Sequence, residues 1–357
     1  MLRRASLLLV ILFVSSCVIG DPLSEGESEH DPIAPTEAHE SSRVDRCTNS
    51  YGVLTELPQL LSQTGLYADI QNKEVHDALW AFVPEFQLWS DTADKQRWIY
   101  VPECDPIDTS NMDDWSFPVG TRFFKEFSVN GQRIETRLIL RTGEGAYDFL
   151  YGTYEWNDDE SEASLAPSEG VLEAKGTSHD IPSEAQCRRC HGSHPDRGGR
   201  PSRALGFSAL QLNHDGAGIR LDDLVAQGRL SHAPEGALTF PGNDVERQAL
   251  GHLHVNCGVC HNATRDGVPQ TDMNLWVNVN QTTVEGTSTY LTAVGKANEI
   301  FNDQNVSARI QPGQPDVSSI IYRMSHRGNN AQMPPLATKE VDETGVEAVK
   351  AWILSLP

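Results

Sequence analysis

Two five-residue motifs constrain this chain more than any other feature of its sequence. CRRCH at residues 187–191 and CGVCH at residues 257–261 each hold a C-x-x-C pair with a histidine directly after the second cysteine. Covalent attachment of a c-type haem needs two thiols at this spacing and a histidine that reaches the iron from the same turn. Chance supplies roughly 0.005 copies of such a motif in a chain of this composition, so two copies predict two c-type haems.

Three other interpretations of the motifs fit the sequence less well. A zinc ribbon also uses two C-x-x-C pairs, but its pairs lie closer together than 187/190 and 257/260. A thioredoxin-like pair needs no following histidine and lies in a βαβ context that this sequence lacks. A disulfide within each pair leaves both histidines unexplained. The residues expected to bind the haems are therefore Cys187, Cys190 and His191 for the first, and Cys257, Cys260 and His261 for the second.

The N-terminal residues predict export and a lipid anchor. Two arginines precede an apolar run from Leu7 to Val14, which is too short to span a bilayer and suits a signal peptide. The run ends in VSSC, which resembles a bacterial lipobox. Residues 1–16 would then be removed and Cys17 acylated; a plain signal peptide with a chance cysteine is the alternative.

Residues 17–45 predict a disordered, acidic tether that follows this anchor. Residues 18–45 hold eight acidic residues and one arginine without any apolar periodicity, so they cannot bury enough surface to fold. The residue after Cys17 is Val18 and not the aspartate that often retains lipoproteins in the inner membrane. We therefore expect the chain on the periplasmic side of the cell envelope, anchored in the outer membrane. The formal net charge of −22 argues against a direct role at nucleic acid.

Two of the seven cysteines remain after the lipid anchor and the haem motifs are assigned. These are Cys47 and Cys104, and in an exported chain they are most simply a disulfide. Such a bond would pin the end of the tether to the first folded region.

Residues 46–180 predict a β-rich, sandwich-like domain. Asn130-Gly131 is the preferred pair for a type I′ hairpin turn, and strand-like runs flank it. In the second run, apolar residues alternate with Glu135, Arg137 and Arg141, which predicts a half-buried strand with one solvated face. YDFLYGTYEW, 147–156, predicts another strand.

A first haem-attachment segment, 181–242, and a mostly helical domain, 243–357, complete the expected multidomain α+β fold. Asn243 and Glu246 form a capping-box pattern before the helix that leads into CGVCH, in which Val245, Ala249 and Leu253 share one face. Two later segments carry apolar stripes at helical spacing: Val317, Ile320, Ile321 and Met324, and then Val346, Val349, Ile353 and Leu356.

The second haem site has an evident distal ligand. Met333 lies beside prolines in QMPP, between two predicted helices, and this order of elements resembles a class I cytochrome c domain. The resemblance implies His261 as proximal and Met333 as distal ligand. Met324 competes, but it lies on the apolar stripe of its helix. A His/Met iron has a raised reduction potential that suits single-electron transfer.

The first haem site has no such methionine, so its distal ligand stays open between histidines and an empty position. His254 is the candidate we name, because it lies on the helix that enters the second motif. His194 is too close to His191 to reach around the ring. The sequence does not rank the remaining histidines, which are His76, His179, His214, His232, His252 and His326.

Arginines gather around the first motif of this acidic chain. They are Arg188, Arg189, Arg197, Arg200 and Arg203. Arginine pairs with carboxylates in two-pronged fashion, so this cluster predicts contact with haem propionates or with a partner. An ordinary solvated loop is the alternative.

Several segments together resemble a family of bacterial diheme c-type cytochromes with a β-rich N-terminal region. They are FQLWSDTADKQRWIYVP (86–102), FPVGTRFFKEF (117–127), IETRLILR, YEWNDD (154–159), IPSEAQCRRCH (181–191), LGFSALQLN (205–213), HLHVNCGVCHN and QMPPLAT. The resemblance implies two haems and an envelope location, and no settled substrate.

Three functions are compatible with these features. The first is a relay of single electrons between unidentified redox partners. The second is a haem-dependent, peroxidase-like enzyme with an open first haem. The third is a binding module that docks a cytochrome to a surface or partner through the β-rich region.

Overall fold

The computed structural model describes residues 51–52, 54–192, 203–236, 238–263, 271–301, 303, 306 and 308–357. These residues belong to one compact unit, Ser42–Pro357. The predicted signal peptide, the tether, Cys17 and Cys47 lie outside the described residues, as do His194, Arg197 and Arg200. None of the helices in the described part is long and apolar enough to cross a bilayer.

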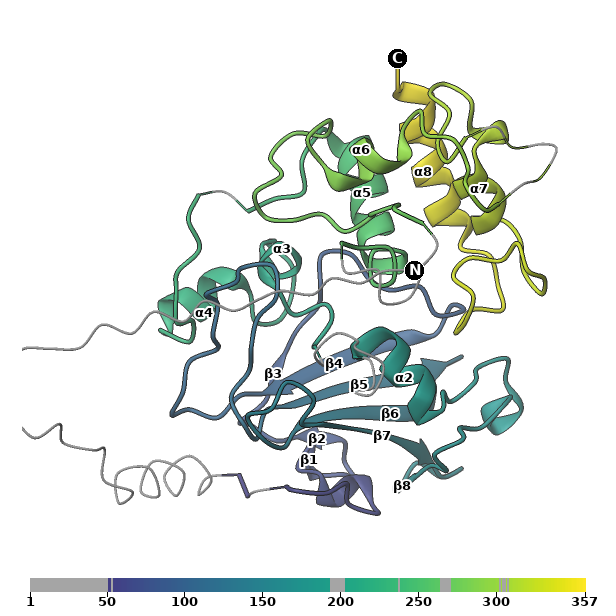
Figure 1. Ribbon diagram of the computed structural model, residues 1–357. Coiled ribbons are helices and arrows are strands. Elements are labelled where there is room, and N and C mark those ends of the chain that lie inside the picture. Colours follow the sequence, from purple (N-terminus) through teal and green to yellow (C-terminus); the bar gives the residue numbers. More distant parts are fainter. Residues whose placement is uncertain are drawn as a thin grey trace, which may run out of the picture. The chain divides into compact units, whose positions relative to one another are not determined.

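One antiparallel sheet of six strands forms the N-terminal half, with each strand next to its neighbours in sequence (Figure 1). Its strands are β3 (Trp80–Ala81), β4 (Asp94–Tyr100), β5 (Arg122–Val129), β6 (Gln132–Arg141), β7 (Phe149–Trp156) and β8 (Ala163–Leu165). A separate two-stranded sheet pairs β1 (Tyr67–Asp69) with β2 (Glu74–Val75), and η1 (Leu61–Gln63) precedes it. The described residues thus hold one large sheet, not two sheets of similar size.

The hairpin between β5 and β6 confirms the predicted turn. Asn130 and Gly131 have φ values of 51° and 81°, as a type I′ turn requires, and Val129 pairs with Gln132. On one face of β6, Leu138 and Leu140 are buried in the aromatic core of the sheet.

The prediction that the other face of β6 is solvated is wrong. Glu135 is 0% exposed and Arg141 is 5% exposed. The sequence pattern correctly predicts that apolar and polar residues alternate along β6. It does not show that helix α2 (Glu184–His191) lies over the polar face and contacts β7. Buried polar residues beneath a helix make this face of the sheet a candidate for a functional site.

Helices and loops follow the sheet, so the fold class is mixed α/β. The remaining elements are η2 (Ala174–Gly176), α3 (Ala209–Leu212), α4 (Leu221–Ala226), α5 (Asp244–Asn256), α6 (Ser288–Ala293), η4 (Pro315–Val317), α7 (Ser319–Met324) and α8 (Glu343–Ser355). The capping box at Asn243 is confirmed, because its side chain accepts from Val245 and Glu246 backbone N–H groups. Ala249 and Leu253 are buried as predicted, whereas Val245 is 41% exposed in the first turn.

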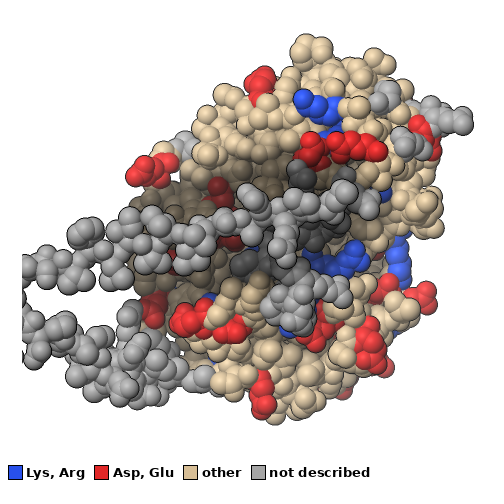
Figure 2. All heavy atoms as spheres, in the orientation of Figure 1, with Lys and Arg blue, Asp and Glu red and all other residues tan. Residues whose placement is uncertain are grey.

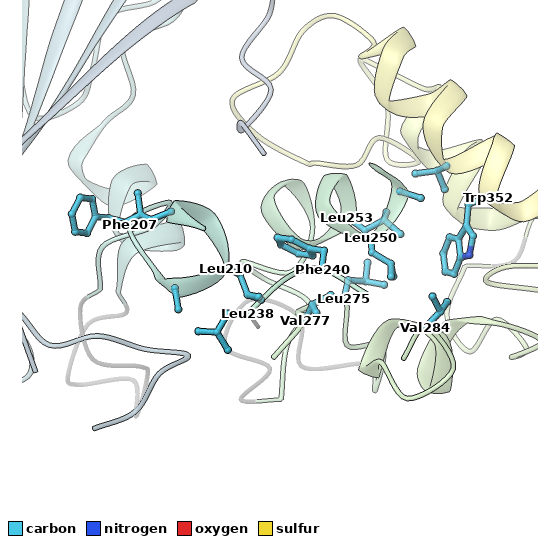
Figure 3. Close-up of a cluster of buried hydrophobic side chains, with 14 of the residues drawn as sticks. Phe207, Leu210, Leu238, Phe240, Leu250, Leu253, Leu275, Val277, Val284 and Trp352 are labelled. Carbon is cyan, nitrogen blue, oxygen red and sulfur yellow. The ribbon is translucent and has the colours of Figure 1, made fainter. Parts of the chain in front are cut away.

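A continuous apolar core joins the sheet to the helices. It runs from Ile99 and Phe123 on the strands to Phe207 beside α3, and on to Trp352 of α8. Figure 3 shows its part from Phe207 to Trp352. The core therefore continues across the predicted domain boundaries at 180/181 and 242/243.

Helices α5 and α8 cross at close range, side by side in Figure 1. A Cβ at Gly345 would lie 2.0 Å from Cε1 of His252, so only glycine permits this approach. The crossing fixes α5, and therefore the second C-x-x-C-H motif that begins at its C-terminal end.

Candidate functional site

Helix α2 presents both cysteines of the first motif on one side. Ser183 caps the helix, and Gln186 completes the capping box, so the helix begins at Glu184. Cys187 and Cys190 are three positions apart and lie on neighbouring turns. The thiols of Cys187, Cys190 and Cys257 are free in the structure.

A cavity of about 330 Å³ lies between α2, the sheet, the end of α5 and the loop after Met333. The first motif contributes Cys187, Cys190 and His191 to its wall. The sheet contributes a polar patch, and α5 contributes His254. Of the histidines weighed as distal ligands, His179 and His254 line this cavity in the described structure.

Three cations form a row across the cavity face of the sheet. Arg97 on β4 pairs in register with Lys125 on β5, which pairs with Arg137 on β6. Like charges directly opposite each other on neighbouring strands are destabilising. A row of three such charges is therefore stable only if anionic groups outside the row neutralise it.

Only one cation of the row has a carboxylate partner among the described residues. Arg137 forms an ion pair with Glu135, which also accepts from His179 Nε2 at 2.6 Å. Burial alone would raise the pKa of Glu135, but Arg137 and His179 hold that pKa below its ordinary value.

Lys125 has no such neutralising partner in the described part of the chain. Its ammonium lies 4.7 Å from the centre of the Phe127 ring. Burial first, and then the charges of Arg97 and Arg137, hold the pKa of Lys125 well below its ordinary value. This cation is therefore the one that an incoming anion would stabilise most.

His191 is held in the tautomer that an iron ligand needs. Its Nδ1 lies 3.2 Å from the carbonyl oxygen of Arg203, which only accepts hydrogen bonds, so Nδ1 carries the proton. Burial lowers the pKa of His191 to about 4, which leaves the ring neutral. The Nε2 lone pair is then available to a metal, and a carbonyl behind a ligating histidine is the usual second partner.

The second motif begins at the end of α5. Burial raises the pKa of Cys257 to about 12, and burial followed by Arg323 and Arg309 lowers the pKa of His261 to about 4. Protonated thiols with a raised pKa are the opposite of a reactive redox pair. Nδ1 of His261 is buried without a hydrogen-bond partner in the described structure, although the backbone of Met273 is close enough to act on the pKa of this histidine in the raising direction.

Met333 is connected to the second motif through Arg323. The backbone N–H of Met333 donates to the carbonyl of Arg323 at 3.0 Å, and the guanidinium of Arg323 is close enough to lower the pKa of His261. Met324, the competing methionine, is 5% exposed in the core, as predicted. The assignment of Met333 as the distal ligand stays a prediction.

Arg203 joins the two motifs. Its backbone N–H donates to the carbonyl of His191 at 2.7 Å, and its guanidinium donates to the carbonyl of Val259, inside CGVCH, at 3.1 Å. A thiolate at Cys260 would also raise the pKa of Cys190, so these two cysteines are neighbours. The predicted arginine cluster thus includes one residue with a structural role; Arg188 pairs with Glu184.

The segment FQLWSD holds the walls of the cavity together, which sequence reasoning missed. A Cβ at Gly251 would lie 2.3 Å from the Phe86 ring, so Phe86 packs directly on α5. The backbone N–H of Trp89 donates to Asn256 at 2.8 Å, and Asp91 accepts from the backbone N–H of Lys339 at 2.8 Å. The sequence signal for this role was the position of Asp91, a polar residue that follows Phe86 and Trp89 outside any strand pattern.

Other predicted residues have simpler surroundings. Cys104 is disulfide-bonded, and its predicted partner Cys47 lies outside the described residues. His252 lies 3.7 Å from the carboxylate of Asp342, and His326 lies against Tyr322. The described residues contain no group of three or more His, Cys, Asp and Glu side chains arranged to hold a metal ion.

Comparisons with known proteins return no relative. No family model matches this chain, and neither a curated protein nor a solved structure matches it.

Proposed function

We propose that this protein is a diheme c-type cytochrome that relays single electrons in the bacterial cell envelope. The observation that carries the proposal is the contact of Arg203 with both C-x-x-C-H motifs, at His191 and at Val259. Two haems attached to motifs that share one arginine would lie close together, and closeness is what transfer between them requires. A bound haem supplies reversible one-electron chemistry at its iron.

The residues around the first motif fit a haem. Cys187 and Cys190 present free thiols to the cavity, and His191 offers its Nε2 lone pair. The disulfide interpretation accounts for neither that lone pair nor the cavity beside it.

The cation row fits the two propionates. Arg137 lies near Cys187 and Cys190, since their thiolates would raise its pKa, and the row runs from there to Lys125 and Arg97. Neighbouring strands are about 4.8 Å apart, so Arg97 lies about 10 Å across the sheet from Arg137. Propionates project from the side of the porphyrin opposite the vinyl groups, so Lys125 and Arg97 would receive them and neutralise the row.

The second haem would be held by Cys257, Cys260 and His261, with Met333 as its distal ligand. The close crossing of α5 and α8 at Gly345 supports a class I-like cytochrome c domain in residues 243–357. In this proposal residues 181–242 attach the first haem to the β-rich residues 46–180, and the sheet is part of its pocket instead of a separate docking module. A sandwich-like second sheet is no longer part of the proposal.

The location and partners follow from the sequence. Cys17 would carry the lipid anchor, in the outer membrane and on the periplasmic side, and the tether would give the cytochrome its reach. Figure 2 shows acidic side chains at many separate places on one face of the molecule. With a net charge of −22, an unidentified redox partner with a basic docking surface is expected.

The test uses the chain from Val18, produced with c-type maturation. Redox titration should show two one-electron transitions, and circular dichroism in the Soret band should show the paired positive and negative lobes of two coupled haems. One transition, or a Soret band without coupling, would contradict the relay between neighbouring haems.

A further inference from the structure

His254 is a polar residue of α5 that lines the cavity of the first haem, next to Val255. It is 3% exposed and lies one turn before Cys257. Its ring is packed between Trp276, at 4.1 Å between ring centres, and Phe240, at 5.3 Å. This packing leaves the ring with one fixed orientation.

The hydrogen bond at Nδ1 decides which nitrogen of His254 carries the proton. The backbone N–H of Val277 donates to Nδ1 at 3.1 Å. A backbone N–H is only a donor, so Nδ1 must present its lone pair. A neutral imidazole then has its single proton on Nε2.

This arrangement is the reverse of that at His191. There a carbonyl accepts from Nδ1–H and leaves a lone pair on Nε2, whereas at His254 the proton occupies Nε2. Coordination of iron through Nε2 of His254 would move the proton to Nδ1 and set it against the N–H of Val277. Two buried donors would face each other, and the hydrogen bond would be lost.

Nε2–H of His254 has no hydrogen-bond partner among the described residues, although the side chain is almost fully buried and lines the cavity. Nε2 is open to the cavity and not sealed in the core, so the acceptor that satisfies it would lie in the cavity.

We propose, given the diheme function above, that His254 is a distal hydrogen-bond donor and not an iron ligand, so the first haem binds a small exogenous molecule. The molecule would bind the iron by one atom and accept a hydrogen bond from Nε2–H. Cyanide, azide and hydrogen peroxide have this chemistry. The other imidazole and amine side chains at the cavity are His179, whose Nε2 is bound to Glu135, Lys125, and Lys339, which pairs with Asp180.

The test probe is cyanide, added to the oxidised diheme protein and followed by low-temperature EPR. The resting protein should show one low-spin and one high-spin ferric signal, and cyanide should convert the high-spin signal to low-spin. His254→Leu should keep the resting signals and weaken cyanide binding about three- to tenfold. His254→Gln, which keeps a donor, should restore most of the affinity, and His232→Gln, at an exposed histidine outside the cavity lining, should behave as wild type.

Two results would overturn the proposal. A low-spin first haem that becomes high-spin in His254→Leu would make His254 the sixth ligand. A first haem that is low-spin in both proteins and does not bind cyanide would assign another ligand, such as Lys125. A haem count below two per chain, from the pyridine haemochrome spectrum, would instead contradict the diheme function itself. If His254→Leu fails to fold, the resting wild-type spectrum and its response to cyanide decide.

Discussion

The guanidinium of Arg203 donates a hydrogen bond to the backbone carbonyl of Val259 at 3.1 Å, while the backbone of the same residue is bonded to His191. One buried residue thus holds the first motif's histidine and the chain between the two cysteines of the second motif. Its guanidinium also lies 4.8 Å from the centre of the Trp276 ring, which itself packs on His254. In the proposed diheme protein, the relative placement of the two haems would therefore depend on Arg203.

Replacement of this bridge should separate the haems electronically. Arg203→Met should reduce the amplitude of the paired Soret lobes and lower the free energy of unfolding by about 1–3 kcal/mol. Arg220→Met is the matched control, because Arg220 is paired with Asp223 near the surface. Equal Soret spectra for the two variants would show that Arg203 does not set the haem geometry.

The cation row predicts a change in potential. Lys125→Met removes a buried positive charge that disfavours the ferric state, so the potential of the first haem should fall by on the order of tens of mV. Lys350→Met is the control, because Lys350 pairs with Glu347 at the surface of α8. Redox titration followed in the Soret band gives the potential of the first haem in each variant. If that potential is the same in Lys125→Met as in wild type, Lys125 does not lie at the haem site.

Local signals predicted the elements well. The Asn130-Gly131 turn and the capping box at Asn243 are confirmed, because each is determined by residues within a few positions of one another. The motifs themselves are read from five adjacent residues. Such features need no knowledge of the rest of the chain.

The environment of the first motif could not be predicted in the same way. Arg97, Lys125 and Arg137 are adjacent only because β4, β5 and β6 pair in one register, and each looks like a solvated residue of an alternating strand. The tautomer of His254 depends on Val277, which lies on a separate loop across the core. Contacts between distant segments decide the chemistry here, and single-sequence patterns do not contain them.

The second haem makes a separate prediction. Met333→Ala should lower its potential by on the order of 100 mV, because a His/Met iron has a raised potential. Met324→Leu, a conservative change in the core, should leave that potential where it is. If the spectrum and potential of Met333→Ala equal those of wild type, Met333 is not the ligand.

Acid should destabilise the fold through His254. Burial and the charge of Arg203 lower the pKa of His254 to about 3 in the folded protein, from an ordinary value near 6.5. At pH values between these two pKa values, the folded state binds fewer protons than the unfolded chain. The free energy of unfolding therefore decreases as the pH falls from the unfolded pKa towards the folded one. At pH 5 the loss from this group is about 2 kcal/mol relative to neutral pH.

Urea unfolding at pH 7 and pH 5 checks this dependence. The decrease in the free energy of unfolding from pH 7 to pH 5 should be about 2 kcal/mol smaller in His254→Gln than in wild type. Equal pH dependence in the two proteins would mean that His254 is not buried as a neutral ring.

The most direct test of the account is the intact mass of the chain from Val18, produced with c-type maturation, with wild type compared with Cys187→Ser/Cys190→Ser. We predict a mass that exceeds the polypeptide by two haems in wild type and by one haem in the double variant, with the remaining haem on the peptide that contains Cys257 and Cys260. A wild-type chain without added haem, whose four motif cysteines all react with a thiol reagent after denaturation, would contradict it.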